Sequence, residues 1–251
     1  MAHPYDHFAP HFDAWQRAFG PPYDDLILPR LVAALGRHGP AARRLADLGV
    51  GTGDLVVALA RRGYAMVAVD RSAPMLAVAR AKAAAAGLAV PPSFVEQDIR
   101  ALRIVPPVDA AICVYTVMNQ LTGDGDLDRA LAAVRDALVG RGLFLFELNL
   151  PASYARYWVG TETVRAGDAT IVRTHRAVPG TPVIEAHVTI QRTSSGQLEE
   201  VYDRIEQRPY TNAEVEAALA RTGFALLERD VFDPFDAGAE PTKSLWIVRR
   251  S

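Results

Sequence analysis

The sequence predicts an α/β fold in which one mostly parallel sheet of seven strands carries helices on both faces, with an antiparallel β segment inserted late in the chain. Two observations lead to this prediction. Over residues 45–150, short apolar runs alternate with segments of helical spacing, a rhythm that is typical of βαβ units. Over residues 161–208, apolar and polar residues alternate with period two, which is typical of antiparallel strands with one buried face.

Residues 1–44 precede the first predicted strand. Aromatic side chains are frequent in the first twenty residues, and apolar residues recur at helical spacing over residues 26–35. An apolar segment outside the sheet must pack somewhere, either as a helix docked on the core or as a cover over a ligand. We expect an N-terminal helical lid followed by a lead-in helix.

Residues 45–150 hold the predicted core. Strands are expected near residues 45–49, 65–70, 93–96, 109–114 and 142–148, and helices near residues 54–62, 73–86 and 126–139. Because ligands of open α/β sheets bind outside the carboxyl ends of the strands, a crevice is expected at that edge.

The rest of the chain divides into two parts. Residues 151–208 are predicted to form the antiparallel insert, as a cover over a second ligand or as a subunit contact. From residue 209 to 251 the α/β pattern returns. Thr211 and Glu214 have capping-box spacing at the start of a helix over 213–222, and two last strands are expected near 224–231 and 245–249. The length and apolar content suit one domain over 1–251.

Composition limits the partners and the compartment. The 27 basic and 29 acidic residues give a net charge of −2 without a basic patch, so nucleic acid is not an expected partner. No apolar run approaches membrane-spanning length, the start does not resemble a signal peptide, and the chain has a single cysteine, Cys113. We therefore expect a cytoplasmic monomer or homodimer that does not bind membranes.

A glycine loop indicates what the crevice binds. Residues 45–54 read LADLGVGTGD, and the next apolar strand ends on Asp70. Strand, glycine loop, helix, strand and acid form the layout of a nucleoside-binding unit, in which the acid can accept two ribose hydroxyls. The spacing is G-x-G-x-G, and Asp54 stands where a dinucleotide site has its third small residue. This departure disfavours a nicotinamide cofactor.

Together with this loop, further motifs resemble the class I S-adenosylmethionine-dependent methyltransferases. They are DRSAPML at 70–76, VEQDI at 95–99 and LVGRGLFLF at 138–146. The opening YDHFAPHFD at 5–13 and the closing helix and strands resemble a small-molecule subset that includes N-methyltransferases. The resemblance implies a Rossmann-like sheet, S-adenosylmethionine as cofactor and S-adenosylhomocysteine as product.

The resemblance also implies a cofactor site. Asp70 would bind the ribose, Asp98 and the Ile99 amide would read the adenine, and the glycines would approach the methionine part. Asp70 could instead cap the following helix, and Met75 could be ordinary core. The full expected set is Tyr5, Trp15, Asp47, Gly49, Gly51, Asp70, Arg71, Met75, Asp98, Ile99 and Val114.

The methyl group is expected near Tyr115, Thr116 and Asn119, which follow the fourth strand. His175, on the insert, is a candidate proton acceptor, because histidine titrates near neutral pH; a structural strand histidine is the alternative. The lone cysteine and the absence of an H-E-x-x-H motif argue against a metal site.

The resulting hypothesis is methyl transfer to a small-molecule acceptor. Thr116 stands where related sequences more often carry an acid or serine. A neutral amine attacks without a strong base, so nitrogen is favoured over oxygen as the acceptor atom. Two alternatives stay open: a nicotinamide-dependent oxidoreductase, and a catalytically silent cofactor-binding protein.

Overall fold

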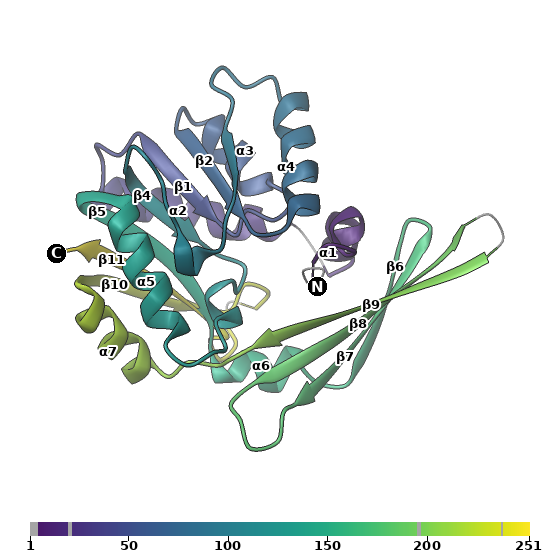
Figure 1. The fold of residues 1–251 in the computed structure, drawn as a ribbon. Helices are drawn as coiled ribbons and strands as arrows, with labels where there is room; N and C mark the ends of the chain where they lie inside the picture. Colours follow the sequence, from purple (N-terminus) through teal and green to yellow (C-terminus); the bar gives the residue numbers. More distant parts are fainter. Residues whose placement is uncertain (1–4, 20–21, 195–196, 237) are drawn as a thin grey trace.

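The computed structural model of the chain describes residues 5–19, 22–194, 197–236 and 238–251. It contains two sheets, a large one in the core and a smaller one that projects from it (Figure 1). The helices are η1 (Ala9–His11), α1 (Phe12–Arg17), α2 (Tyr23–His38), α3 (Asp54–Ala60), α4 (Ala73–Ala85), η2 (Ile99–Ala101), η3 (Met118–Gln120), α5 (Asp126–Ala137), α6 (Pro151–Tyr157) and α7 (Asn212–Thr222). The strands are β1 (Arg44–Leu48), β2 (Ala65–Asp70), β3 (Ser93–Glu96), β4 (Val108–Cys113), β5 (Leu138–Asn149), β6 (Thr161–Ala166), β7 (Ala169–Ala177), β8 (Ile184–Ser194), β9 (Gln197–Gln207), β10 (Phe224–Phe232) and β11 (Lys243–Arg250).

The core sheet has seven strands in the order β10-β11-β5-β4-β1-β2-β3. Strands β3, β2, β1, β4 and β5 run parallel, whereas β11 is antiparallel to both β5 and β10. The chain order reverses between β1 and β4, and such a switch point opens a crevice at the carboxyl ends of the strands. The predicted mostly parallel sheet is confirmed.

Helices cover both faces of this sheet, because its central strands are apolar on both sides. Leu45 packs in the cluster that contains α2, α3 and α4, while its neighbour Ala46 packs with α5 and α7. Successive strand residues point to opposite faces. A fully buried parallel strand therefore reads as an apolar run, and residues 45–48 follow this pattern except at Asp47.

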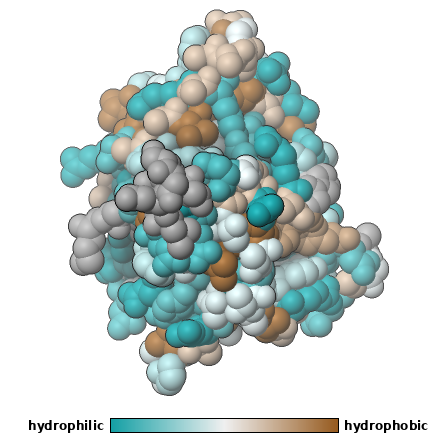
Figure 2. All heavy atoms as spheres, turned by 90° about the vertical axis from the view of Figure 1, so that its right-hand side faces the viewer, coloured by the Kyte–Doolittle hydropathy of each residue, from teal (hydrophilic) through white to brown (hydrophobic). Residues whose placement is uncertain are grey.

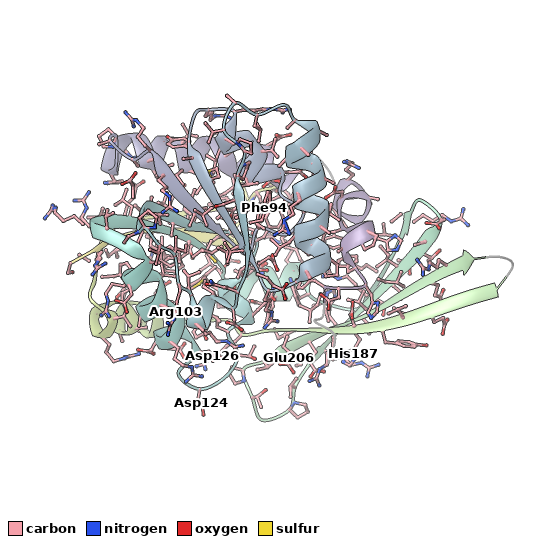
Figure 3. The ribbon with its side chains drawn as sticks, turned by 45° about the horizontal axis from the view of Figure 1, so that its top comes forward. Phe94, Arg103, Asp124, Asp126, His187 and Glu206 are labelled. Atoms are coloured by element: carbon pink, nitrogen blue, oxygen red, sulfur yellow. The ribbon has the colours of Figure 1, made fainter. Side chains whose placement is uncertain are left out.

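The smaller sheet is the predicted insert. It is antiparallel, in the order β6-β7-β8-β9. One face is apolar and includes Ile171, Val188 and Ile205. The opposite face is polar: His187 points to the side turned away from α1 (Figure 3), and the strand register places Glu206 on the same face. The period-two pattern of the sequence was thus correctly assigned to antiparallel strands.

The N-terminal segment, residues 5–19, lies between the insert and the core (Figure 1). Phe8 is fully buried against the apolar face of the insert, with Phe12 and Trp15 partly buried beside it. On this side of the molecule, hydrophilic and apolar side chains are interspersed (Figure 2). The segment is therefore docked as a layer between two sheets, which agrees with the docked-helix alternative, and its action as a cover over a ligand stays a prediction.

Two expectations about elements were wrong. The helix expected to continue to residue 139 ends at Ala137, and β5 begins at Leu138 rather than near 142. Residues 151–157, expected within the antiparallel insert, form helix α6, which begins at Pro151. Proline is favoured in the first turn of a helix, because its missing N–H has no partner there in any case.

Candidate active site

A cavity of about 600 Å³ opens at the carboxyl edge of the core sheet. Its walls come from the glycine loop, the ends of β2 and β4, the N-terminal segment, and the insert with α6. This volume lies within the range of small-molecule sites. Within the part of the chain that the structure describes, no helix is long and apolar enough to cross a bilayer, and no group of three or more His, Cys, Asp or Glu side chains is arranged to hold a metal ion.

The glycine loop faces the cavity with backbone alone. Gly51 has φ +54°, and a Cβ built there would meet no protein atom within 4 Å. At Gly49, φ is +78° and a Cβ would collide with Val117. Gly49 is therefore needed for packing and turn geometry, while Gly51 leaves space for a ligand to approach the chain.

Asp70 lies at the end of β2 and is tied to this loop. Its carboxylate accepts hydrogen bonds from the backbone N–H groups of Gly51 and Ser72, each at 2.9 Å. Burial raises the pKa of Asp70, and these two N–H groups oppose the rise together with the N–H group and the charge of Arg71. Each oxygen keeps a further acceptor position, which suits two ribose hydroxyls. The helix cap considered for Asp70 is provided by Ser72, which accepts from the Met75 N–H.

Asp47 lies beneath the loop, 2% exposed. Burial, with Asp24 and Asp70 nearby, holds the pKa of Asp47 well above its ordinary value. Its carboxyl lines the cavity next to the glycine loop, and a cation bound there would favour its ionised form.

The expected adenine end is built around Asp98. The Arg100 guanidinium donates to both carboxylate oxygens, at 2.9 and 2.6 Å, and lowers the pKa of Asp98. Arg71 Nη1 lies 4.0 Å from the same carboxylate. Ile99 and Met75 line the cavity beside it, and Met75 is 2% exposed. Asp98 therefore keeps its place in the cavity wall but is already paired with arginine, which the sequence motif did not indicate.

Tyr115 and Thr116 follow Val114 at the end of β4, and all three line the cavity. Both residues have positive φ, 60° and 62°. For side chains other than glycine this conformation costs roughly 1–3 kcal/mol each and clusters at functional sites. The Tyr115 hydroxyl accepts from Gln16 of the N-terminal segment, so the segment reaches the position where the methyl group was expected.

Two predicted catalytic residues are corrected by the structure. Asn119 is fully buried and does not line the cavity; its side chain donates to the Arg208 carbonyl and accepts from the Asn149 N–H. It is a structural link between segments. His175 also lies off the cavity, against Arg173 and Trp158. Burial lowers the pKa of His175 to about 4, so it does not serve as a proton acceptor for a ligand in the cavity.

The two predicted aromatic residues of the N-terminal segment do line the cavity. Tyr5 Oη accepts from Gln120 Nε2 at 3.2 Å, and burial raises the pKa of Tyr5 to about 12. The Trp15 ring carries the Arg173 guanidinium 4.6 Å from its centre. The Trp15 ring therefore already has a cation against one of its faces.

Sequence reasoning missed the polar residues that the insert contributes. Gln207, 1% exposed at the end of β9, donates to Thr116 Oγ1 at 2.8 Å and accepts from Tyr154 Oη at 3.0 Å. Arg173 forms an ion pair with Glu162 at 3.0 Å, and both residues belong to the insert side of the cavity wall. These residues follow the same period-two pattern as any strand, and only the folded pairing shows that they face the cavity.

Comparison with known proteins agrees with this geometry. Residues 45–142 match a family model described as a methyltransferase domain. The chain therefore carries a class I S-adenosylmethionine-dependent methyltransferase domain. It aligns along 100% of its length, and 98% of the other chain, with the CcbJ methyltransferase from Streptomyces caelestis, at TM-score 0.80 and 25% identity. Solved structures of this methyltransferase fold include complexes with S-adenosylmethionine and with sinefungin.

Two curated relatives have sequences similar to this chain. A demethylmenaquinone methyltransferase of Thermus thermophilus is 35% identical over 55% of this chain and 60% of its own length. A Streptomyces fradiae protein is named dTDP-3-amino-3,6-dideoxy-alpha-D-glucopyranose N,N-dimethyltransferase. It is 28% identical over 66% of this chain and 64% of its own length. The chain spans 51–64% of the length of the curated relatives that it matches first.

S-Adenosylmethionine is the cofactor that fits this site. The open face of Gly51, the free acceptor positions of Asp70 and the apolar wall at Met75 suit a methionine part, a ribose and an adenine in that order. A methyltransferase domain with this cofactor replaces the nicotinamide alternative that the sequence left open.

Proposed function

We propose that the protein transfers a methyl group from S-adenosylmethionine to an amine nitrogen of a small-molecule acceptor, with amino sugars as the first class to test. The observation that supports nitrogen as the acceptor atom is the Thr116–Gln207 pair, an uncharged hydroxyl and an uncharged amide that both line the cavity. Such groups suit an uncharged amine, whose lone pair attacks before any proton leaves. Among the described residues that line the cavity there is no histidine to activate a hydroxyl.

The acceptor for which one relative is named supports amino sugars as the first class to test. The Streptomyces fradiae relative is named for N,N-dimethylation of an amino sugar nucleotide. The Thermus relative is named for demethylmenaquinone, so the relatives are named for different acceptors. The polar insert is the part of the cavity that would distinguish acceptors, because the glycine loop and the ends of β2 and β4 are occupied with the cofactor.

The reaction would be one in-line displacement, for which the cofactor supplies an electrophilic methyl group on a cationic sulfur. The protein's part is to hold the two reactants. Asp70 and the glycine loop fix the cofactor, Tyr115 and Thr116 border the transfer position, and the N-terminal segment excludes water. Orienting two reactants in this way can contribute up to roughly 7–11 kcal/mol, so a strong base is not required.

The test uses methyl-labelled S-adenosylmethionine and a panel of amino sugars, each paired with the sugar that carries a hydroxyl in place of the amine. Product mass spectrometry identifies the acceptor atom. We expect N-methylated products and no product from the paired hydroxyl compounds. Methylation of the hydroxyl partners would contradict the nitrogen assignment. Tight cofactor binding without turnover across the panel would favour the silent cofactor-binding alternative.

A further inference from the structure

Asp24 is a buried carboxylate in the cavity wall that neither the sequence motifs nor the proposed reaction uses. It lies in the first turn of α2, is 9% exposed, and lines the cavity together with Asp54 and the glycine loop. Among the described residues, no hydrogen bond or ion pair reaches its carboxylate. Burying an unpaired carboxylate is costly, and such a group is normally paired or bound to a ligand.

Helix stabilisation does not explain this burial. An acid in the first turn of a helix interacts favourably with the helix dipole. Asp25 occupies the same turn and is exposed to solvent, so the helix already has an acid there at little desolvation cost. Asp24 therefore has a reason to be buried that lies outside its own helix.

The neighbouring charges leave this end of the cavity negative. Lys82 is the cation beside Asp24, and its Nζ is shared between Asp13 at 2.6 Å and Asp54 at 2.8 Å. One ammonium thus faces several acids, and the excess charge favours a cationic group in the cavity.

We propose that Asp24 binds the α-ammonium group of the methionine part of S-adenosylmethionine and so selects a cofactor that carries an intact amino-acid end. Asp24 and Asp54 flank the loop whose glycines approach that part of the cofactor. The inference deepens the proposed function at its cofactor half and rests on it there. It does not depend on which acceptor is methylated.

The test compares two ligands that differ at this end. S-Adenosylhomocysteine carries the ammonium, whereas 5′-methylthioadenosine has the same nucleoside and sulfur without the amino acid. In calorimetric titrations, Asp24→Asn should bind S-adenosylhomocysteine at least about tenfold more weakly than the wild-type protein does. This is the loss expected for one charge-assisted hydrogen bond. Affinity for 5′-methylthioadenosine should stay within about twofold. The matched control, Asp25→Asn, should change neither affinity.

Three results would overturn the proposal: unchanged S-adenosylhomocysteine affinity in Asp24→Asn, equal weakening of both ligands, or the same effect from Asp25→Asn. A wild-type protein that binds neither ligand would contradict the cofactor assignment itself, and a wild-type protein that binds both but methylates no amine would contradict only the proposed reaction. Failure of the Asp24 proposal can therefore be told apart from failure of the cofactor assignment and from failure of the proposed reaction.

A second measurement needs no variant. Burial and the neighbouring acids raise the pKa of Asp24 to about 7, against the opposing effect of Lys82. The groups around it are Asp13, Asp25, Asp47, Asp54, Lys82 and Tyr115. In the wild-type protein, affinity for S-adenosylhomocysteine relative to 5′-methylthioadenosine should increase as the pH rises through about 7, because ionised Asp24 binds the ammonium. A ratio that is constant or falls with pH would contradict the proposal.

Discussion

At the scale of single residues, Asp70 connects the glycine loop to the expected ribose. Replacing it with alanine removes the acceptors for the Gly51 and Ser72 N–H groups and for the ribose hydroxyls. Because at least one charge-assisted hydrogen bond to the ligand is lost, Asp70→Ala should weaken S-adenosylhomocysteine binding about tenfold or more. Calorimetric titration measures this change.

Glu96 offers a matched control for Asp70. It ends the adjacent strand β3 in register with Asp70, but it is exposed and lies off the cavity. Glu96→Ala should leave the affinity within about twofold, as expected for a surface substitution. Equal affinities of folded Asp70→Ala and wild-type protein would show that Asp70 does not hold the ribose.

Residues whose role follows from local sequence could be predicted, and those whose role depends on distant partners could not. Gly51 and Asp70 belong to one strand–loop–helix–strand unit, so their positions follow from a short pattern. Asn119 matches a motif but bonds to Arg208 and Asn149, which lie far along the chain. The direction of its side chain is set by those long-range pairings. Asp24 resembles any acid that begins a helix, so its burial gave no sequence signal.

At the scale of elements, Gln207 joins the insert to the core. Its amide bonds to Thr116 and Tyr154, and Asn149 Nδ2 lies 3.3 Å from its Oε1. Gln207→Leu keeps the volume but leaves buried polar groups unpaired, so it should lower the free energy of unfolding by about 1–3 kcal/mol. It should also raise KM for the acceptor while S-adenosylhomocysteine affinity stays unchanged.

Denaturant unfolding and steady-state kinetics measure these two effects. The control is Gln191→Leu on β8, whose side chain bonds to Glu200 at the solvent-exposed side of the same insert. It should change stability by less than about 0.5 kcal/mol. If Gln207→Leu weakened S-adenosylhomocysteine binding as much as it raised KM, the insert would be acting on the cofactor rather than on the acceptor.

The N-terminal segment is held to the cofactor loops by polar contacts as well as by its aromatics. Asp6 accepts from Ser72 Oγ at 2.8 Å, and Asp13 accepts from Thr52 Oγ1 at 2.6 Å. Because these loops would contact bound cofactor, S-adenosylhomocysteine should slow tryptic cleavage after the exposed Arg17. Asp13→Asn should speed cleavage without ligand and reduce the protection.

Mass spectrometry of the fragments over time measures this cleavage, with cleavage after the exposed Arg141 of β5 as internal reference. Protection of both sites alike would indicate general stabilisation rather than ordering of the segment. The burial of Phe8 against the insert also bears on truncation. Removing residues 1–20 would expose an apolar sheet face, so we expect such a truncation to lower solubility as well as turnover.

Elements with strong periodicity were predicted closely, and those set by tertiary context were not. Strand β2 was predicted with its observed ends because an apolar run and an acid define it. The early start of β5 depends on its pairing of Leu138 with Val108, which no local pattern reports. Helix α6 is a single short segment between two strands, and its few residues carry too little periodicity to separate it from the insert.

At the scale of the whole molecule, buried acids around one loop link stability to pH and to ligand. Burial raises the pKa of Asp24, Asp47 and Asp70. A carboxyl with a higher pKa in the folded than in the unfolded chain lowers the free energy of unfolding as the pH rises between the two values. For Asp24 this window extends from about 4 in the unfolded chain to about 7 in the folded protein.

Ligand-free protein should therefore unfold at a lower temperature at about pH 8 than at about pH 6.5. The comparison begins there because burial lowers the pKa of His11 and His175, which act in the opposite direction below that pH. S-Adenosylhomocysteine should reduce the difference, since its ammonium compensates the ionised acids. Asp24→Asn should reduce it without ligand. Scanning calorimetry of these three samples at the two pH values measures the effect, and a ligand-free protein that is more stable at the higher pH would contradict this account of the loop.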